Sequence, residues 1–305
     1  MRRQSLVIGA LLALTTMGTG AQVKPDPDYP DVRYGPHERN VLDFWRAQAP
    51  GPAPLVLYIH GGGFRQGDKR SLPAARLAEY LAAGFAVAAL NYRLTGAAPF
   101  PAQYRDCARA LQHLRSRAKE WNIDPRLVAS TGSSAGAGTS MWLAFHDDLA
   151  DPASDDPVAR QSTRLTCIAV DNGQPSYDPR FAEKIGIPRP NFDRHPFFLP
   201  FYGIQAGEID TPKAYKLYDE AAPITFLTAD DPPAHLSYNR RDEPCDAQSD
   251  VQLVVHHPRL GLALKERMDK LGIECLIRYP GRPGGEPMEP LEFIRKHFAR
   301  AREAR

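Results

Sequence analysis

A serine flanked by glycines, between an apolar strand-like run and a helical stretch, constrains the fold of this 305-residue chain most strongly. The run Leu127 to Thr131 leads directly into Gly132-Ser133-Ser134-Ala135-Gly136, a G-x-S-x-G pattern. A sharp strand-to-helix turn needs small residues on both sides, and it lifts the serine hydroxyl above the sheet. An ordinary glycine-rich turn is the alternative. In this context we predict that Ser134 is a nucleophile, supported by Gly132 and Gly136.

A second glycine motif lies upstream of the serine. The apolar run from Leu55 to His60 ends in three glycines, Gly61, Gly62 and Gly63. Consecutive glycines allow main-chain N–H groups to turn toward one developing negative charge, where larger side chains would obstruct them. A flexible turn is the alternative interpretation of these glycines. The order of the two motifs along the chain favours an oxyanion-binding loop.

The remaining apolar runs alternate with helical patterns, which predicts a mostly parallel, doubly wound α/β sheet. One helix is expected from Pro101 to about Trp121 and another after Ser134. The segment 175–229 breaks the alternation with many Pro, Phe and Tyr residues, and we interpret it as a cap or lid insertion rather than a long surface loop. Strands are expected at Val41–Trp45, Leu55–His60, Ala86–Leu90, Leu127–Thr131, Thr166–Val170, His235–Tyr238 and Cys275–Tyr279, and later helices at Pro258–Leu271 and from about Pro290.

The N-terminus has the pattern of a secretory signal peptide. Arg2 and Arg3 precede an apolar stretch, and Thr19-Gly20-Ala21 supplies small residues for cleavage. The apolar stretch is shorter than the ~20 residues of a membrane span, so an anchor is the weaker alternative. We therefore expect residues 1–21 to be removed, residues 22–305 to form one α/β domain with an extended start at 22–36, and the protein to be secreted or periplasmic.

Charge and cysteine content exclude several classes of function. The 38 Lys and Arg nearly balance the 36 Asp and Glu, without a long run of one sign, so neither nucleic acid nor a membrane surface is indicated as a partner. The four cysteines are spaced too widely for a zinc or redox motif, and no histidine pair has zinc-protease spacing. We expect no metal or organic cofactor, and buried free thiols at Cys107, Cys167 and Cys275.

The two glycine motifs together resemble the carboxylesterase and hormone-sensitive-lipase-like branch of the α/β-hydrolases. The resemblance is specific from about Tyr34 to Gly136, and it includes His60-Gly61-Gly62-Gly63-Phe64, Gly67-Asp68-Lys69, Asn91-Tyr92-Arg93 and the serine turn. It implies that the main-chain N–H groups of Gly62, Gly63 and Ala135 form an oxyanion hole. It also implies that His60, with Gly61, supports this loop, and that Asn91, Tyr92 and Arg93 are scaffold residues.

The same resemblance suggests the position of a catalytic acid, in a loop after a late strand. Asp242 follows the apolar segment 235–238 and is our candidate. A carboxylate there would fix the tautomer of a catalytic histidine and stabilise its cation. Glu243 is adjacent, and Asp171 ends the preceding predicted strand, so both stay open as alternatives. A solvated loop charge is the further alternative for Asp242.

The histidine departs from the family pattern. After the last predicted strand, relatives have a histidine a few residues on, whereas this chain reads Arg282-Pro283-Gly284-Gly285-Glu286. We instead predict that His256 is the general base, with His257 as the alternative, because the order Ser134, Asp242, His256 matches this fold. A helix beginning at Pro258 would lower the imidazole pKa at its N-terminus. Two surface histidines at a helix cap would have the same sequence.

These features predict a serine carboxylic ester hydrolase that acts through an acyl-enzyme. The resemblance implies a small-molecule or carbohydrate ester as substrate, with a short acyl chain. The missing late histidine supports one rival, a catalytically impaired hydrolase-fold protein that binds a ligand or partner. A lactone-cleaving or acyl-transferring enzyme is a third possibility. Neither acyl preference nor oligomeric state follows from the sequence.

Overall fold

An eight-stranded sheet organises the computed structural model, which describes residues 23–189, 193, 195–284 and 287–304. The strand order is β1-β2-β4-β3-β5-β6-β7-β8, where β1 and β2 are antiparallel to their neighbours and the other pairs are parallel. The carboxyl ends of the parallel strands therefore meet at one edge, where ligands of open α/β sheets bind. The strands are β1 Tyr29–Arg33, β2 Val41–Trp45, β3 Ala53–Ile59, β4 Ala86–Leu90, β5 Ile123–Ser133, β6 Cys167–Asp171, β7 Ala234–Ser237 and β8 Cys275–Arg278.

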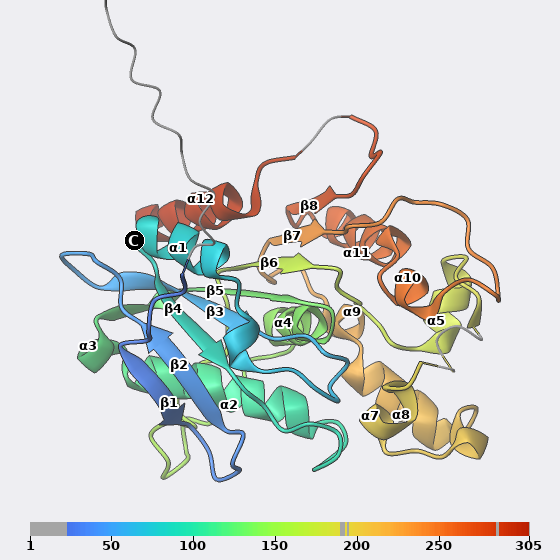
Figure 1. Ribbon diagram of the computed structural model, residues 1–305, viewed down its shortest axis with the longest axis horizontal. Coiled ribbons are helices and arrows are strands. Elements are labelled where there is room, and N and C mark those ends of the chain that lie inside the picture. The colour runs from blue at the N-terminus through green and yellow to red at the C-terminus, as the bar shows by residue number, and fades with distance from the viewer. Residues whose placement is uncertain (1–22, 190–192, 194, 285–286, 305) are drawn as a thin grey trace, which may run out of the picture.

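Helices cover both faces of the sheet (Figure 1). On one face, α1 (Ala74–Ala82) and α12 (Pro290–Glu303) pack Tyr80 and Phe293 against Val56 and Val87. The other face is covered by α2 (Ala102–Ser116), α3 (Ala118–Trp121), α4 (Ala135–Phe145) and α11 (Pro258–Lys270). The central strands β3 and β4 are buried almost throughout, which explains why their sequences are continuous apolar runs.

The segment between β6 and β7 is folded largely into short helices that lie beyond the carboxyl edge of the sheet (Figure 1). Most of its described aromatic residues are buried, and Phe201 stacks on Phe64 from the glycine loop with ring centroids 4.4 Å apart. The described elements are α5 Pro179–Lys184, α7 Phe198–Tyr202, η2 Ala206–Glu208, α8 Pro212–Ala221 and α9 Pro223–Phe226. Elsewhere in the described part of the chain lie η1 (Lys69–Ser71) and α10 (Val251–Val255).

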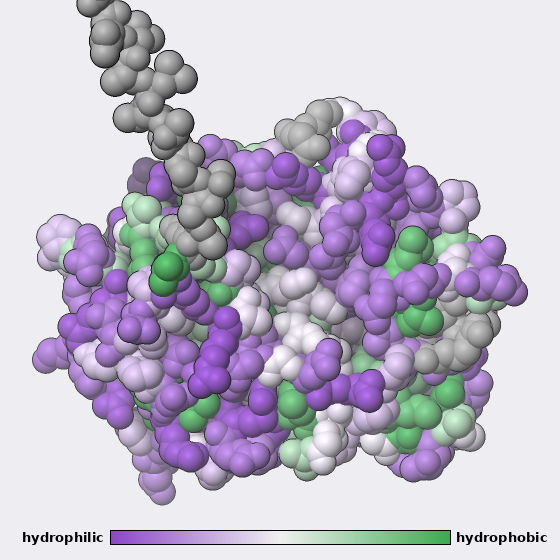
Figure 2. Space-filling model, viewed as in Figure 1, coloured by the Kyte–Doolittle hydropathy of each residue, from purple (hydrophilic) through white to green (hydrophobic). Residues whose placement is uncertain are grey.

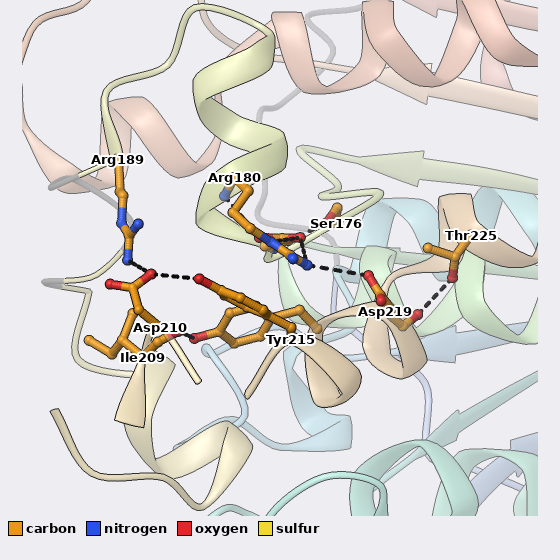
Figure 3. A network of polar contacts seen from close by, with 10 residues as sticks. Ser176, Arg180, Arg189, Ile209, Asp210, Tyr215, Asp219 and Thr225 are labelled. Carbon is orange, nitrogen blue, oxygen red and sulfur yellow. Dashed lines mark hydrogen bonds and ion pairs between the residues drawn. The ribbon is translucent and has the colours of Figure 1, made fainter. Parts of the chain in front are cut away.

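Polar contacts link the helices of this segment to one another (Figure 3). The guanidinium of Arg180 on α5 bonds to Asp219 on α8 and lies 4.0 Å from the ring centre of Tyr215. Arg189 and Tyr215 both bond to the carboxylate of Asp210. These contacts join the start of the segment to α8, and so they hold its side chains in fixed positions near the sheet edge.

Several sequence expectations are corrected at the level of elements. Residues 29–33, expected to be extended without packing, form β1 and pair with β2, with Tyr29 stacked on Trp121. The helix expected from Pro101 to Trp121 is divided into α2 and α3 at Arg117. The other predicted strands and helices are present to within a few residues.

Other predictions meet the structure in different ways. Cys107, Cys167 and Cys275 are buried free thiols, as expected. The predicted signal peptide, residues 1–21, lies outside the described residues. In the described part of the chain, no helix is long and apolar enough to span a bilayer. The face in Figure 2 is mostly hydrophilic, with small scattered apolar patches.

Candidate active site

Ser134 lies in a strained turn between β5 and α4. Its backbone has φ 54° and ψ −121°, a region that non-glycine residues rarely adopt and that costs about 1–3 kcal/mol. The turn is held by a hydrogen bond from Ser134 N to the Asp171 carbonyl, 3.0 Å, and by one from Gly138 N to the Ser134 carbonyl, 2.9 Å. The strand-to-helix turn predicted from the sequence is therefore present.

Glycines on both sides of Ser134 allow the turn to pack closely against β3. A Cβ atom would lie 2.3 Å from the Ile59 carbonyl oxygen at Gly132, and 2.0 Å from it at Gly136. Both distances are far inside van der Waals contact, and the obstructing atom is backbone. The end of β3 and the serine turn are thus fixed against each other, which brings the glycine loop next to Ser134.

The glycine loop after β3 is bent by residues with positive φ. Gly62 has φ 107° and Gly63 has φ 58°, and a Cβ on Gly62 would lie 2.2 Å from the Gln66 carbonyl oxygen. Gly63 and Ala135 both line the hollow at Ser134. Among the described residues, no protein acceptor is found for the N–H groups of Gly62, Gly63 and Ala135. The predicted oxyanion donors are therefore close to Ser134 and available to a ligand.

His60 is buried beneath this loop. Its Nδ1 lies 2.7 Å from the Gly61 carbonyl, and its ring stacks on Tyr92 with centroids 4.3 Å apart. Burial is the main cause that lowers the His60 pKa to about 4. The Tyr92 hydroxyl in turn donates to the His60 carbonyl, 2.9 Å. His60 and Tyr92 contact the loop and, among the described contacts, not Ser134.

His256 reaches the serine from the loop region after β7. Its Nε2 lies 2.9 Å from the Ser134 hydroxyl oxygen, which is hydrogen-bond distance. The main-chain carbonyl of Gln252, one helical turn earlier, raises the pKa of the ring. If the ring carries its proton on Nδ1, a lone pair on Nε2 is directed at the serine proton.

The pKa of His256 is lowered, but not for the predicted reason. Burial is the largest cause and outweighs the Gln252 carbonyl, while the nearby Arg240 lowers the pKa further. His256 caps the C-terminus of α10, not the N-terminus of the next helix. The residue at that N-terminus is His257, whose side chain accepts from Arg259 N, 3.2 Å, and whose Nε2 bonds to the Glu243 carbonyl, 2.8 Å. His257 is thus turned away from Ser134.

The position expected for Asp242 is corrected by the structure. Its carboxylate accepts from Arg259 Nε, 3.0 Å, and among the described contacts it does not reach His256. Neither alternative acid reaches His256 in the described contacts. Asp171 lines a separate hollow with Arg76, and Glu243 is an exposed residue whose carbonyl holds His257. Arg259, which follows Pro258 on α11, draws the Asp242 carboxylate away from the imidazole.

Several residues that line the site were not predicted from the sequence. His195 and Phe197, from the segment before α7, line the hollows at Ser134, as does Gln252 on α10. His195 Nδ1 accepts from Phe197 N, 3.2 Å, and burial is the main cause that lowers its pKa to about 4. No local motif marks these residues, because their approach to Ser134 depends on how the segment folds back over the sheet edge.

The described residues do not assemble a metal site. No group of three or more His, Cys, Asp or Glu side chains among them is arranged to hold a metal ion. The site instead combines a strained serine, a neutral imidazole and main-chain N–H groups. This combination suits nucleophilic attack on a carbonyl carbon, with the oxyanion held by backbone donors.

Comparisons with known proteins agree with the fold and the motifs. Residues 42–170 match the BD-FAE family model. A probable carboxylic ester hydrolase, LipM, of Mycobacterium tuberculosis is 28% identical over 218 residues, which is 70% of this chain and 47% of LipM. The esterase LipQ of the same organism is 27% identical over 70% of this chain and 48% of its own length. The chain thus spans about half the length of these curated relatives.

A solved structure shows the same architecture over most of the chain. The truncated form of a carbohydrate esterase from gut microbiota aligns with a TM-score of 0.66 at 19% identity, covering 90% of this chain and 95% of the other. The chain has the α/β-hydrolase fold. Its sequence is similar to those of carboxylic ester hydrolases.

Proposed function

We propose that the protein is a serine carboxylic ester hydrolase, with Ser134 as nucleophile and His256 as general base. The observation that carries the proposal is the 2.9 Å contact between His256 Nε2 and the Ser134 hydroxyl in a turn of strained geometry. The similarity to carboxylic ester hydrolases and to a carbohydrate esterase supports the same reaction class.

The proposed reaction has two acyl-transfer steps. His256 Nε2 takes the hydroxyl proton as Ser134 Oγ attacks the ester carbonyl carbon. The negative oxygen is stabilised by the N–H groups of Gly62, Gly63 and Ala135. His256 then gives its proton to the leaving alcohol, which departs as the acyl-enzyme forms. Water, deprotonated by His256, attacks the acyl-enzyme, and the acid is released as His256 returns this proton to Ser134 Oγ.

In this mechanism a main-chain carbonyl replaces the usual carboxylate. The Gln252 carbonyl orients the ring and stabilises the imidazolium through a dipole rather than a full charge. No described carboxylate contacts the ring. We therefore propose that His256 acts with Gln252 and without Asp242, Asp171 or Glu243.

Hydrolysis of p-nitrophenyl acetate by the purified protein tests the assignment. Ser134→Ala and His256→Ala are expected to lower kcat by a factor on the order of 10⁴ to 10⁶, the range for serine hydrolases. Ser133→Ala is the matched control, because Ser133 lines the separate hollow with Asp171 and Arg76. Equal turnover by wild type and Ser134→Ala would contradict the proposal. Absence of turnover with every short ester would favour the ligand-binding alternative.

A fluorophosphonate adds independent evidence for the nucleophile. We expect one covalent adduct on the peptide that contains Ser134, and none in Ser134→Ala. Labelling of Ser133 instead, or labelling that persists in Ser134→Ala, would refute Ser134 as the reactive hydroxyl.

We also propose that the substrate carries a short acyl chain or is linked to carbohydrate, and that the protein is secreted or periplasmic after loss of residues 1–21. The first part is supported by similarity to a carbohydrate esterase, and the second by the N-terminal pattern of Arg2, Arg3 and an apolar stretch. The mass of the exported protein measures the cleavage, with Gln22 expected as its first residue. An exported protein that retains Met1 would overturn this part.

A further inference from the structure

Two hollows of different character meet at Ser134. The smaller has about 20 Å³ of free volume, room for about one water molecule. The larger has about 410 Å³. The smaller is walled mainly by apolar side chains, Phe64, Tyr177, Phe197 and Val255. The larger is lined mainly by polar and basic groups, including Arg65, Gln66, His195, Gln252 and His256.

The position of the proton donor indicates which hollow binds the alcohol portion of the ester and which binds the acyl portion. In the proposed function, on which this inference rests, His256 must protonate the oxygen of the leaving alcohol. His256 lines the larger hollow and not the smaller one. The alcohol portion therefore lies in the larger hollow. The acyl chain lies on the other side of Ser134, in the small apolar hollow beside Ala135.

The alcohol hollow carries a positive charge at Arg65. The described residues that line it include Arg65 and the two imidazoles of His195 and His256, and no Asp or Glu. Arg65 is exposed, and in the described part of the chain its guanidinium has no carboxylate partner. Other arginines near the sheet edge are paired, as Arg93 is with Asp106 and Arg180 with Asp178. The positive charge of Arg65 is thus available to a bound molecule.

The position of Arg65 suits contact with the alcohol portion. It follows Gly63 by two residues, and its main-chain N donates to the Gly62 carbonyl, 3.1 Å. The loop that supplies the oxyanion donors therefore also sets the position of the cation. His195, which also lines this hollow, is held to Gln252 by a 3.1 Å side-chain contact. The positive charge of Arg65 makes the cleft complementary to an anion.

We propose that the preferred substrate is an ester of an acetyl-sized acyl group with an alcohol that carries a carboxylate, and that Arg65 binds this carboxylate. A guanidinium recognises a carboxylate through two parallel N–H···O bonds. Phe197 and Val255 limit the acyl chain. In an apolar pocket, each extra methylene that does not fit costs roughly 10–200-fold in kcat/KM.

The charge preference is tested with 3-acetoxybenzoate and its neutral analogue 3-acetoxybenzamide. The readout is the ratio of the two kcat/KM values, each divided by the rate of alkaline hydrolysis of that ester. We expect a ratio of about 5–10 for wild type, a several-fold lower ratio for Arg65→Gln, and a ratio below one for Arg65→Glu. Arg105→Gln is the matched control, an exposed arginine on α2 away from the cleft.

Salt and chain length complete the test. Raising the ionic strength to about 0.5 M should reduce the wild-type ratio toward that of Arg65→Gln, because exposed charges are screened. For wild type, kcat/KM should be at least about 10-fold higher for acetate than for butyrate esters. Phe197→Ala should reduce this ratio. A ratio that is equal in wild type and Arg65→Gln would overturn the role of Arg65. Loss of all turnover in wild type would instead overturn the proposed function.

Discussion

The substitution Asp242→Asn separates a carbonyl-supported histidine from a conventional triad. In the structure, Asp242 forms an ion pair with Arg259 and not with His256. Each side chain is about one-third exposed, at 34% for Asp242 and 30% for Arg259. Such pairs contribute about 0.2–1 kcal/mol to stability. Asparagine keeps an oxygen that can accept from Arg259, so we expect Asp242→Asn to lower the free energy of unfolding by an amount near the lower end of this range.

The two mechanisms predict very different rates for this variant. A triad that loses its acid through Asp→Asn loses about 10⁴ in kcat, which corresponds to about 5.5 kcal/mol at 1.36 kcal/mol per factor of ten. An indirect effect limited to ~1 kcal/mol would change kcat about fivefold at most. The expected change for Asp242→Asn is therefore less than fivefold, three orders of magnitude from the alternative.

The assay is initial-rate kinetics with p-nitrophenyl acetate, alongside thermal unfolding to confirm that the variant is folded. Glu243→Gln and Asp171→Asn serve as parallel variants, since neither carboxylate contacts His256 in the described contacts. A 100-fold or greater loss of kcat in folded Asp242→Asn would refute the reasoning. It would mean that the loop rearranges to bring Asp242 to the imidazole during the reaction.

The fold was largely predictable because its signals are local. Apolar runs such as Leu55–His60 and the glycines around Ser134 indicate structures that residues close in sequence determine. The strands and the turn could therefore be predicted from the sequence alone. β1 was missed because Pro30 and Asp31 interrupt its pattern, and its stability comes from pairing with β2 and from the contact of Tyr29 with Trp121.

Only those parts of the site that lie within a short sequence motif could be predicted directly. His256 was selected by chain order, and the structure brings it to Ser134. The acid was misplaced because the charge of Asp242 is visible in the sequence, whereas the partner Arg259 and the carbonyl of Gln252 are chosen by the path of the loop. A main-chain acceptor has no sequence signature, and His195 reaches the cleft through tertiary folding alone.

Three further results are expected. His257→Ala removes the N-cap of α11 and should cost about 1 kcal/mol in the free energy of unfolding, measured by urea titration, with kcat within a few-fold of wild type; a loss as large as that of His256→Ala would mean that the wrong histidine was assigned. Because burial lowers the pKa of His256, kcat/KM should rise with increasing pH through an apparent pKa below 6.5 and should no longer change near pH 7. A rise of kcat/KM centred above pH 7 would contradict this. Gly62→Ala places a Cβ 2.2 Å from the Gln66 carbonyl oxygen and should lower kcat by about 100 to 1,000-fold, whereas unchanged kcat would exclude this loop from the oxyanion hole.

The absence of a carboxylate behind His256 in the described contacts connects the mechanism to the proposed substrate. When the ring takes the serine proton it becomes a cation, and its described surroundings hold Arg240, Arg65 and His195 rather than an acid. The Gln252 carbonyl offsets only part of that charge. A substrate carboxylate bound at Arg65 would lie in the same hollow as the imidazolium and would stabilise it in the transition state. The benefit of Arg65 should then appear in kcat as well as in KM. An effect of Arg65→Gln confined to KM would show that the anion aids binding alone.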